Sequence, residues 1–226
     1  MLAMNRDEQV SRPRALAPGR RWTGMRASLF PSEAGGGTWI GASDAGLSLA
    51  LVNWYAKPQR DRALCVSRGI IIPHLLAAEN LAEVAAMFAD LPLAKINPFR
   101  LIAASLKERR LCEWRWDGKR LTCSQFGWKR RHWFSSGYDE ALANKKRAAV
   151  VRDIAKPAPA RLRKLHQSHL PDQGPFSICM HRKDAKTVSY TEIVATKSGA
   201  AMRYVAGSPC TKKPGTPRLL SFASGA

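Results

Sequence analysis

The sequence predicts an α+β fold in which mostly antiparallel sheets are layered with helices. The predicted elements follow the order strands, helices, strands, helix, strands, and not the strict alternation that produces a parallel sheet. Two hairpin signals, at residues 43–46 and at Asp117-Gly118, join strand-like segments. The length of 226 residues suits one good-sized domain, so we expect a single domain over 1–226.

The first third of the chain is predicted to begin with loop and to continue into a hairpin. Pro13, Pro18 and Pro31 interrupt regular structure after Glu8, so the first 35 residues are expected to be mostly loop. Residues 38–41 and 47–53 then read as two strands around a turn. The second of these strands lacks strict alternation, so we expect both of its faces to be covered.

The middle of the chain predicts helices followed by another hairpin. Pro73 suits the first turn of a helix, and apolar residues recur at helical spacing as far as Leu91. Glu79-Asn80 is expected to divide this region into two short helices. Strands are predicted at 99–106, 111–116, 119–123 and 132–135.

The last third predicts helices and then a return to strands. Residues 139–154 form a basic helical pattern, and 156–173 are less regular because four prolines surround them. Strands are predicted at 176–180, 187–196 and 201–205.

The composition disfavours a membrane-spanning, a secreted or a disulfide-rich protein. No apolar run is long enough to span a membrane, and no secretory signal opens the chain, so we expect a cytoplasmic protein. The five cysteines contain no C-x-x-C pair, which disfavours a disulfide framework and a structural zinc site. His166 and His169 have a spacing compatible with a metal pair, but no acidic or Cys ligand is near them in sequence. We therefore predict no metal site and no cofactor.

The net charge of +20 is the one extreme value of the composition. Lysines and arginines are spread over separate clusters, which favours a solvated basic surface. Four tryptophans, at 114, 116, 128 and 133, lie among these basic residues, a mixture that can also stack and hold nucleic acid. Aromatic strand residues are more often core, so nucleic-acid binding is an alternative that we do not favour.

Several short stretches resemble, in sequence order, the NRDE family, which is also called the transport and Golgi organisation protein 2 family. The naming motif is Asn5-Arg6-Asp7-Glu8. The other matching stretches are 11–13, 36–41, Asn53, 67–69, 97–103 and 187–191. The resemblance implies a fold similar to that of N-terminal-nucleophile hydrolases, an αββα sandwich of mostly antiparallel sheets, with a first strand that is truncated in this sequence.

The same resemblance suggests site residues. Residues 46–54 look like the segment of bile-salt and penicillin V acylases that carries an oxyanion-hole Asn, which implies a catalytic role for Asn53. The Asn5-x-Asp7 pattern is similar to their strand end where an Asp contacts the amine of the nucleophile, which implies a catalytic role for Asp7. The ligand-binding residues that we predict beside them are Asn5, Arg6, Glu8 and Arg12.

The nucleophile itself is missing from this sequence. Family members usually begin Met-Cys, whereas Leu2 has no nucleophilic atom. Either the chain starts at an internal Met of a longer gene, which we favour, or this member has lost catalysis. The chain is therefore expected to be inactive as written, and to be an amide hydrolase if it is extended.

The alternative to a hydrolase is a non-catalytic protein that binds an anionic ligand such as a haem, an acyl-CoA or a lipid. Arg6, Arg12 and the high net charge favour this alternative. The expected partner in either case is a small molecule, an amide substrate or an anionic ligand.

Overall fold

The computed structural model describes residues 1–152 and 158–223 of the chain. Its strands form two sheets in which every pair of neighbouring strands is antiparallel. The smaller sheet has the order β1-β9-β10-β11 and consists of β1 (Leu2–Gln9), β9 (Ala185–Ala195), β10 (Gly199–Ala206) and β11 (Arg218–Ser221).

The larger sheet contains seven strands that follow the chain in order from β2 to β8. Its strands are β2 (Leu16–Thr23), β3 (Arg26–Ser32), β4 (Ile40–Ser43), β5 (Leu47–Asn53), β6 (Phe99–Ser105), β7 (Arg110–Trp116) and β8 (Leu121–Gly127). Each strand pairs with the next along the chain, so this sheet is built largely from local connections.

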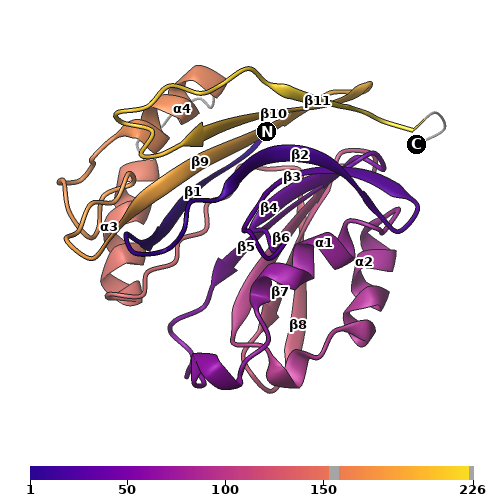
Figure 1. The fold of residues 1–226 in the computed structure, drawn as a ribbon, viewed down its shortest axis with the longest axis horizontal. Helices are drawn as coiled ribbons and strands as arrows, with labels where there is room; N and C mark the ends of the chain where they lie inside the picture. Colours follow the sequence, from indigo (N-terminus) through magenta and orange to yellow (C-terminus); the bar gives the residue numbers. More distant parts are fainter. Residues whose placement is uncertain (153–157, 224–226) are drawn as a thin grey trace.

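Helices cover the outer faces of the two sheets (Figure 1). The seven-stranded sheet carries α1 (Ile71–Leu75) and α2 (Leu81–Met87), and the four-stranded sheet carries α3 (Glu140–Arg152) and α4 (Pro159–Gln167). Short 3-10 turns lie at Arg62–Leu64, Arg68–Ile70, Phe88–Asp90 and Leu93–Lys95. The layers therefore run helix, sheet, sheet, helix, as the sequence predicted. None of the described helices has the length and apolar character of a membrane span.

Two apolar clusters hold these layers together. One lies between the two sheets, where Leu29 and Ile40 of the larger sheet meet Ile193 and Met202 of the smaller sheet. The other lies between the larger sheet and α1 and α2. Strand β5 contributes to both clusters, because Leu49 faces the helices and Ala50 faces the other sheet. The prediction that both faces of this strand are covered is confirmed.

Local sequence features explain several of these elements. Asn80 separates α1 from α2 and caps the second helix, since its side chain accepts a hydrogen bond from the Glu83 N–H at 2.9 Å. Gly46 turns the β4–β5 hairpin with a φ of 83°. Gly41 allows α1 to approach β4, because a Cβ there would lie 2.7 Å from Leu76 Cδ1. The two predicted hairpins and the break between the helices are confirmed.

The prediction of loop over the first 35 residues is wrong, because β2 and β3 occupy much of this stretch. Pro18 is tolerated because β2 is an edge strand whose register shifts between Leu16 and Gly19. Pro31 lies beyond the pairs that β3 forms with β4, at Ser28 and Leu29. Proline therefore interrupts the ladder only where a backbone N–H is not needed.

The strands predicted at 132–135 and 176–180 are also wrong, because neither segment joins a sheet. Arginine side chains bind the first of these backbones: Arg100 donates to the Phe134 carbonyl, and Arg147 donates to the Ser135 carbonyl at 3.2 Å. The second consists of turns and bends, and its Ile178 and Cys179 N–H groups donate to the carbonyls of residues 170 and 168 and not to a neighbouring strand.

The predicted elements near the end of the chain need smaller corrections. Helix α3 covers most of the predicted helix 139–154, and residues 153–154 lie outside the described ranges. Helix α4 lies within the segment 156–173, which was predicted to be less regular. Residues 156–157 of this segment also lie outside the described ranges. Strands β9 and β10 confirm the last two predicted strands, while β11 was not predicted.

Candidate functional site

A cavity of about 1250 Å³ opens beside β1, the edge strand of the four-stranded sheet. Its walls come from β1, β5, the segment 128–137 and the helices α3 and α4. All six residues that the sequence singled out line it: Asn5, Arg6, Asp7, Glu8, Arg12 and Asn53. These six residues do not form one hydrogen-bonded network. They comprise an ion-pair cluster, a buried aspartate and two asparagines with different partners.

The first group is an ion-pair cluster of two arginines and two glutamates. Arg6 bonds to Glu33 at 2.5 Å and lies 3.5 Å from Glu8. Arg12 bonds to the same two carboxylates, each at 2.8 Å. The Arg6 guanidinium also stacks over Trp39, with its carbon 4.2 Å from the ring centroid. Both arginines that were predicted to bind a ligand are thus paired with carboxylates of the chain itself.

The second group surrounds Asp7, on the opposite face of β1. Successive side chains of a strand point to opposite faces, so Arg6 faces Trp39 while Asp7 faces α3. Asp7 accepts a hydrogen bond from the Thr187 hydroxyl at 2.6 Å and lies 3.5 Å from the Arg147 guanidinium. Burial raises the pKa of the Asp7 carboxyl, and the attraction of Arg147 and the bond from Thr187 only partly offset this effect.

The third group consists of the two asparagines, which have different surroundings. The Asn5 side chain donates to the His166 and Ile178 carbonyls, both at 2.9 Å, and so ties β1 to the end of α4. Asn53 lies at the end of β5 and donates to the Tyr55 hydroxyl at 2.8 Å. The Asn5 side-chain amide is therefore already bonded to two backbone carbonyls, while Asn53 bonds to an aromatic side chain that also lines the cavity.

The N-terminal residues form part of the same wall. Met1 and Leu2 line the cavity, and burial lowers the pKa of the Met1 α-amine. An amine with a lowered pKa is more readily available as a base at neutral pH. Neither side chain offers a nucleophilic atom, as the sequence indicated.

Comparison with known proteins identifies the family. The model of the family described as "Transport and Golgi organisation 2" matches residues 1–151, which include the Asn5-Arg6-Asp7-Glu8 motif and β1 to β8. The chain belongs to this family. No curated protein matches the sequence.

Among solved structures, the fold of this chain is similar to that of a bile acid hydrolase. A mutant of the conjugated bile acid hydrolase from Clostridium perfringens is 10% identical, with a TM-score of 0.52, over 98% of this chain and 92% of that chain. Penicillin V acylase from Agrobacterium tumefaciens is 14% identical, with a TM-score of 0.47, over 98% of this chain and 81% of that chain. The likeness to the bile acid hydrolase concerns the fold alone.

Several residues of the cavity were not found from the sequence. Glu33 and Arg147 are the ion-pair partners of the motif, and Thr187 bonds to Asp7. Each lies far from the motif along the chain, so no local pattern links it to the motif. Thr187 lies in a stretch that resembles the family, but only the register of β9 against β1 places it opposite Asp7.

Histidine and cysteine side chains are further reactive groups in and near this region. His166 lines the cavity, and burial lowers its pKa to about 4, which keeps the ring neutral. It does not pair with His169 as a metal site. His169 instead belongs, with Cys179, His181 and Cys210, to a separate group of potential metal ligands, none of which lines the cavity.

Proposed function

We propose that this chain binds a small anionic ligand with an apolar body, such as a haem, an acyl-CoA or a phospholipid, in the cavity beside β1. The charge of the cavity lining supports this proposal most directly. Among the described residues, nine arginines and lysines line it, against four aspartates and glutamates. A concave site lined by one sign of charge concentrates ligands of the opposite sign.

The arrangement of these charges suggests where the anionic group lies. Each lining carboxylate that the structure describes has an arginine beside it: Glu8 and Glu33 contact Arg6 and Arg12, Asp7 contacts Arg147, and Asp184 contacts Arg182. The excess of positive charge therefore comes from other residues, which include the exposed Lys129 and Arg131. We place the anionic group of the ligand at this rim, and not at the naming motif.

The size and apolar lining of the cavity support an apolar ligand body. Its volume of about 1250 Å³ exceeds the roughly 300–1,000 Å³ of sites for drug-sized ligands. Leu2 and Met4 of β1 and Leu51 of β5 contribute apolar surface, together with Leu106 and Leu111. A ligand with one charged end and a bulky apolar part matches this distribution.

The experiment measures the affinity for haemin and for palmitoyl-CoA by quenching of tryptophan fluorescence. We expect at least one of them to bind, and the double variant Lys129→Glu with Arg131→Glu to weaken binding by about tenfold, or roughly 1.4 kcal/mol. The matched control is Lys107→Glu with Lys145→Glu, an equal charge change at two exposed residues outside the cavity.

The control distinguishes a site from a general effect of charge. Equal weakening by both double variants would show that only the net charge matters and would overturn the proposal. Failure of both ligands to bind the unaltered chain at about 100 µM would also overturn it. Binding of DNA or RNA with steep salt dependence, in the absence of either ligand, would favour the nucleic-acid alternative instead.

A second candidate function is amide hydrolysis. Asp7, Asn53 and the half-buried α-amine of Met1 line one cavity, which supports it. In such a reaction the thiol of an N-terminal Cys loses its proton to its own amine and attacks the carbonyl carbon. The C–N bond breaks, the protonated amine leaves, and water then hydrolyses the thioester.

The test of hydrolysis uses a form of the chain extended so that it begins with a cysteine about one strand length before Asn5. Incubation with an activated amide or ester should add an acyl group to that cysteine, detected by mass spectrometry. Asp7→Ala in the same form should reduce the acylation rate at least about tenfold. Absence of acylation by any such substrate would contradict the hydrolase without affecting the binding proposal.

A further inference from the structure

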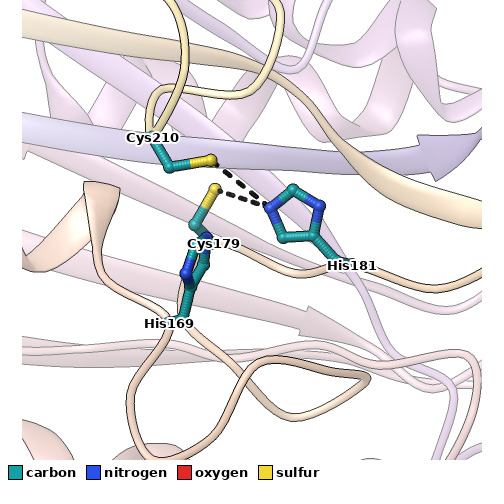
Figure 2. A group of neighbouring side chains, drawn as sticks. All are labelled: His169, Cys179, His181 and Cys210. Atoms are coloured by element: carbon teal, nitrogen blue, oxygen red, sulfur yellow. Dashed lines mark hydrogen bonds between the residues drawn. The ribbon is translucent and has the colours of Figure 1, made fainter.

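Four side chains from distant parts of the chain meet outside the cavity. They are His169, which follows α4, Cys179 and His181, which precede β9, and Cys210, in the connection between β10 and β11 (Figure 2). One ligand atom from each residue lies within 4.8 Å of those of the other three. Two thiols and two imidazoles form a complete set of ligands for a tetrahedral transition metal.

The distances in this group suit a tetrahedral ion. Zinc bonds of about 2.3 Å to sulfur and 2.0–2.1 Å to nitrogen give a tetrahedron with edges of roughly 3.3–3.8 Å. His181 Nε2 lies 3.7 Å from Cys179 Sγ and 3.4 Å from Cys210 Sγ. Figure 2 shows the two sulfur atoms converging on this ring nitrogen. An ion at the centre of the group therefore requires only small movements of the side chains.

The polar atoms of the group also point to a missing partner. His169 Nε2 is buried and has no hydrogen-bond partner within residues 1–152 and 158–223. Buried polar atoms are nearly always satisfied, so an unpartnered ring nitrogen beside two thiols needs an explanation. Two thiolates would neutralise the charge of a divalent ion, which lowers the cost of burying it.

We propose that His169, Cys179, His181 and Cys210 bind one zinc ion as a closed structural site. Four protein ligands leave no open position, and none of the four lines the cavity, which is the pattern of structural and not catalytic zinc. The ion joins the end of α4, the turn before β9 and the β10–β11 connection. Metal binding thus supplies stability where the chain has little regular structure.

The site also supports the candidate residue Asp7 indirectly. Met180 lies between two of the ligands, and its N–H donates to the Thr187 hydroxyl at 2.8 Å. That hydroxyl donates in turn to Asp7 at 2.6 Å. Zinc would fix the position of this segment and so the orientation of Thr187, although the metal proposal does not depend on any role of Asp7.

The first experiment measures metal content. The chain is purified without a histidine tag in the presence of a reductant, and zinc is measured by mass spectrometry. We expect about one zinc per chain. After removal of zinc, added Co²⁺ should give the ligand-field bands of a tetrahedral site and thiolate-to-cobalt charge transfer. Cobalt reconstitution of the unaltered chain does not depend on any variant folding.

The second experiment identifies the ligands. Cys210→Ser and His169→Ala should each weaken zinc binding at least about 100-fold, whereas Cys123→Ser, at an exposed position of β8, should bind zinc normally. A chelator should lower the melting temperature of the unaltered chain and of Cys123→Ser, but not that of Cys210→Ser. These outcomes together would support the site.

Other outcomes would overturn it. These are a reduced, reconstituted chain that binds no stoichiometric zinc or cobalt, a cobalt spectrum without thiolate charge transfer, and zinc binding that Cys210→Ser leaves unchanged. A disulfide between Cys179 and Cys210 that persists in the cell-isolated protein, with no metal bound after its reduction, would assign the group to redox chemistry instead.

Discussion

The two helix layers of this molecule are stabilised in different ways. Between the seven-stranded sheet and α1 and α2, the core is almost wholly apolar and includes Phe88, Phe99 and Trp114. Under α3 and α4, the buried apolar cluster among the described residues is much smaller and consists of Val151, Leu165 and Ile178. Charged groups replace apolar side chains in this second layer.

Ion pairs to the buried Glu192 and to Asp7 connect the second layer to its sheet. Glu192 of β9 is fully buried and bonds to Arg163 of α4 at 2.7 Å, to Arg203 of β10 at 3.1 Å and to the Tyr190 hydroxyl at 2.7 Å. Arg147 of α3 reaches Asp7 of β1. The layer of α1 and α2 is therefore stabilised by apolar packing, whereas the layer of α3 and α4 carries polar groups from which a site can be built.

The largest expected effect comes from breaking the apolar layer. Phe99 is fully buried and packs against Phe88, with ring centroids 6.4 Å apart. Phe99→Ala removes this contact and leaves a cavity, so we expect the free energy of unfolding to fall by about 3–5 kcal/mol. Urea denaturation measures this change. Trp22→Ala, at an aromatic residue that is 70% exposed, should change it far less.

A smaller effect is expected from the polar layer. Glu192→Gln keeps the volume of the side chain but removes the charge that Arg163 and Arg203 face, so we expect a loss of about 2 kcal/mol at neutral pH. Glu79→Gln, at a carboxylate whose side chain is 63% exposed, should cost at most about 0.5 kcal/mol. An equal loss in both variants would contradict the special role of Glu192.

The pH dependence of this variant sharpens the comparison. Burial alone would raise the pKa of Glu192, but the hydrogen bonds from Arg163, Tyr190 and Arg203 lower it below its ordinary value. The carboxylate therefore stabilises the fold fully above the unfolded pKa of about 4.3, and this contribution is lost as pH falls through the folded pKa. The stability difference between the unaltered chain and Glu192→Gln should shrink correspondingly in acid, whereas the loss caused by Phe99→Ala should not.

The smallest effect is expected at Asp7 and has the opposite sign. Its raised folded pKa means that ionisation of this carboxyl opposes folding, a cost absent below the unfolded pKa that grows as pH rises through the folded pKa. Asp7→Asn should therefore raise the melting temperature slightly at pH 8, and the gain should vanish in acid. Asp184→Asn, at an exposed carboxylate beside Arg182, serves as the control. A less stable Asp7→Asn variant at pH 8 would show that the attraction of Arg147 dominates.

Local sequence features predicted much of the larger sheet. Its neighbouring strands follow one another along the chain, so turn residues such as Gly46 and the Asp117-Gly118 pair marked its hairpins. The cap at Asn80 marked the break between α1 and α2 in the same way. The strand predicted at 132–135 was wrong because arginine side chains from other elements bind the backbone of this segment, and no local sequence pattern indicates those contacts.

The candidate site was predictable only in part. The resemblance to the family located the residues of β1 and Asn53, and all of them line one cavity. No local signal linked them to their partners Glu33, Arg147 and Thr187, because each contact joins segments remote in sequence. The His and Cys group was missed for the same reason: Cys179-x-His181 is a short pair, but His169 and Cys210 complete it only through the turns that surround β9.

By itself, then, the sequence determined the family, the class of fold and the hairpins of the larger sheet, because motifs, alternation and turn residues act over a few neighbouring positions. Only the tertiary structure decided that Arg6 and Arg12 are balanced by Glu8 and Glu33, that Asp7 is paired with Arg147, and which histidines and cysteines meet. Charge pairing and metal-ligand geometry depend on distances of a few ångströms between remote segments, and those distances are set by how the sheets and helices pack.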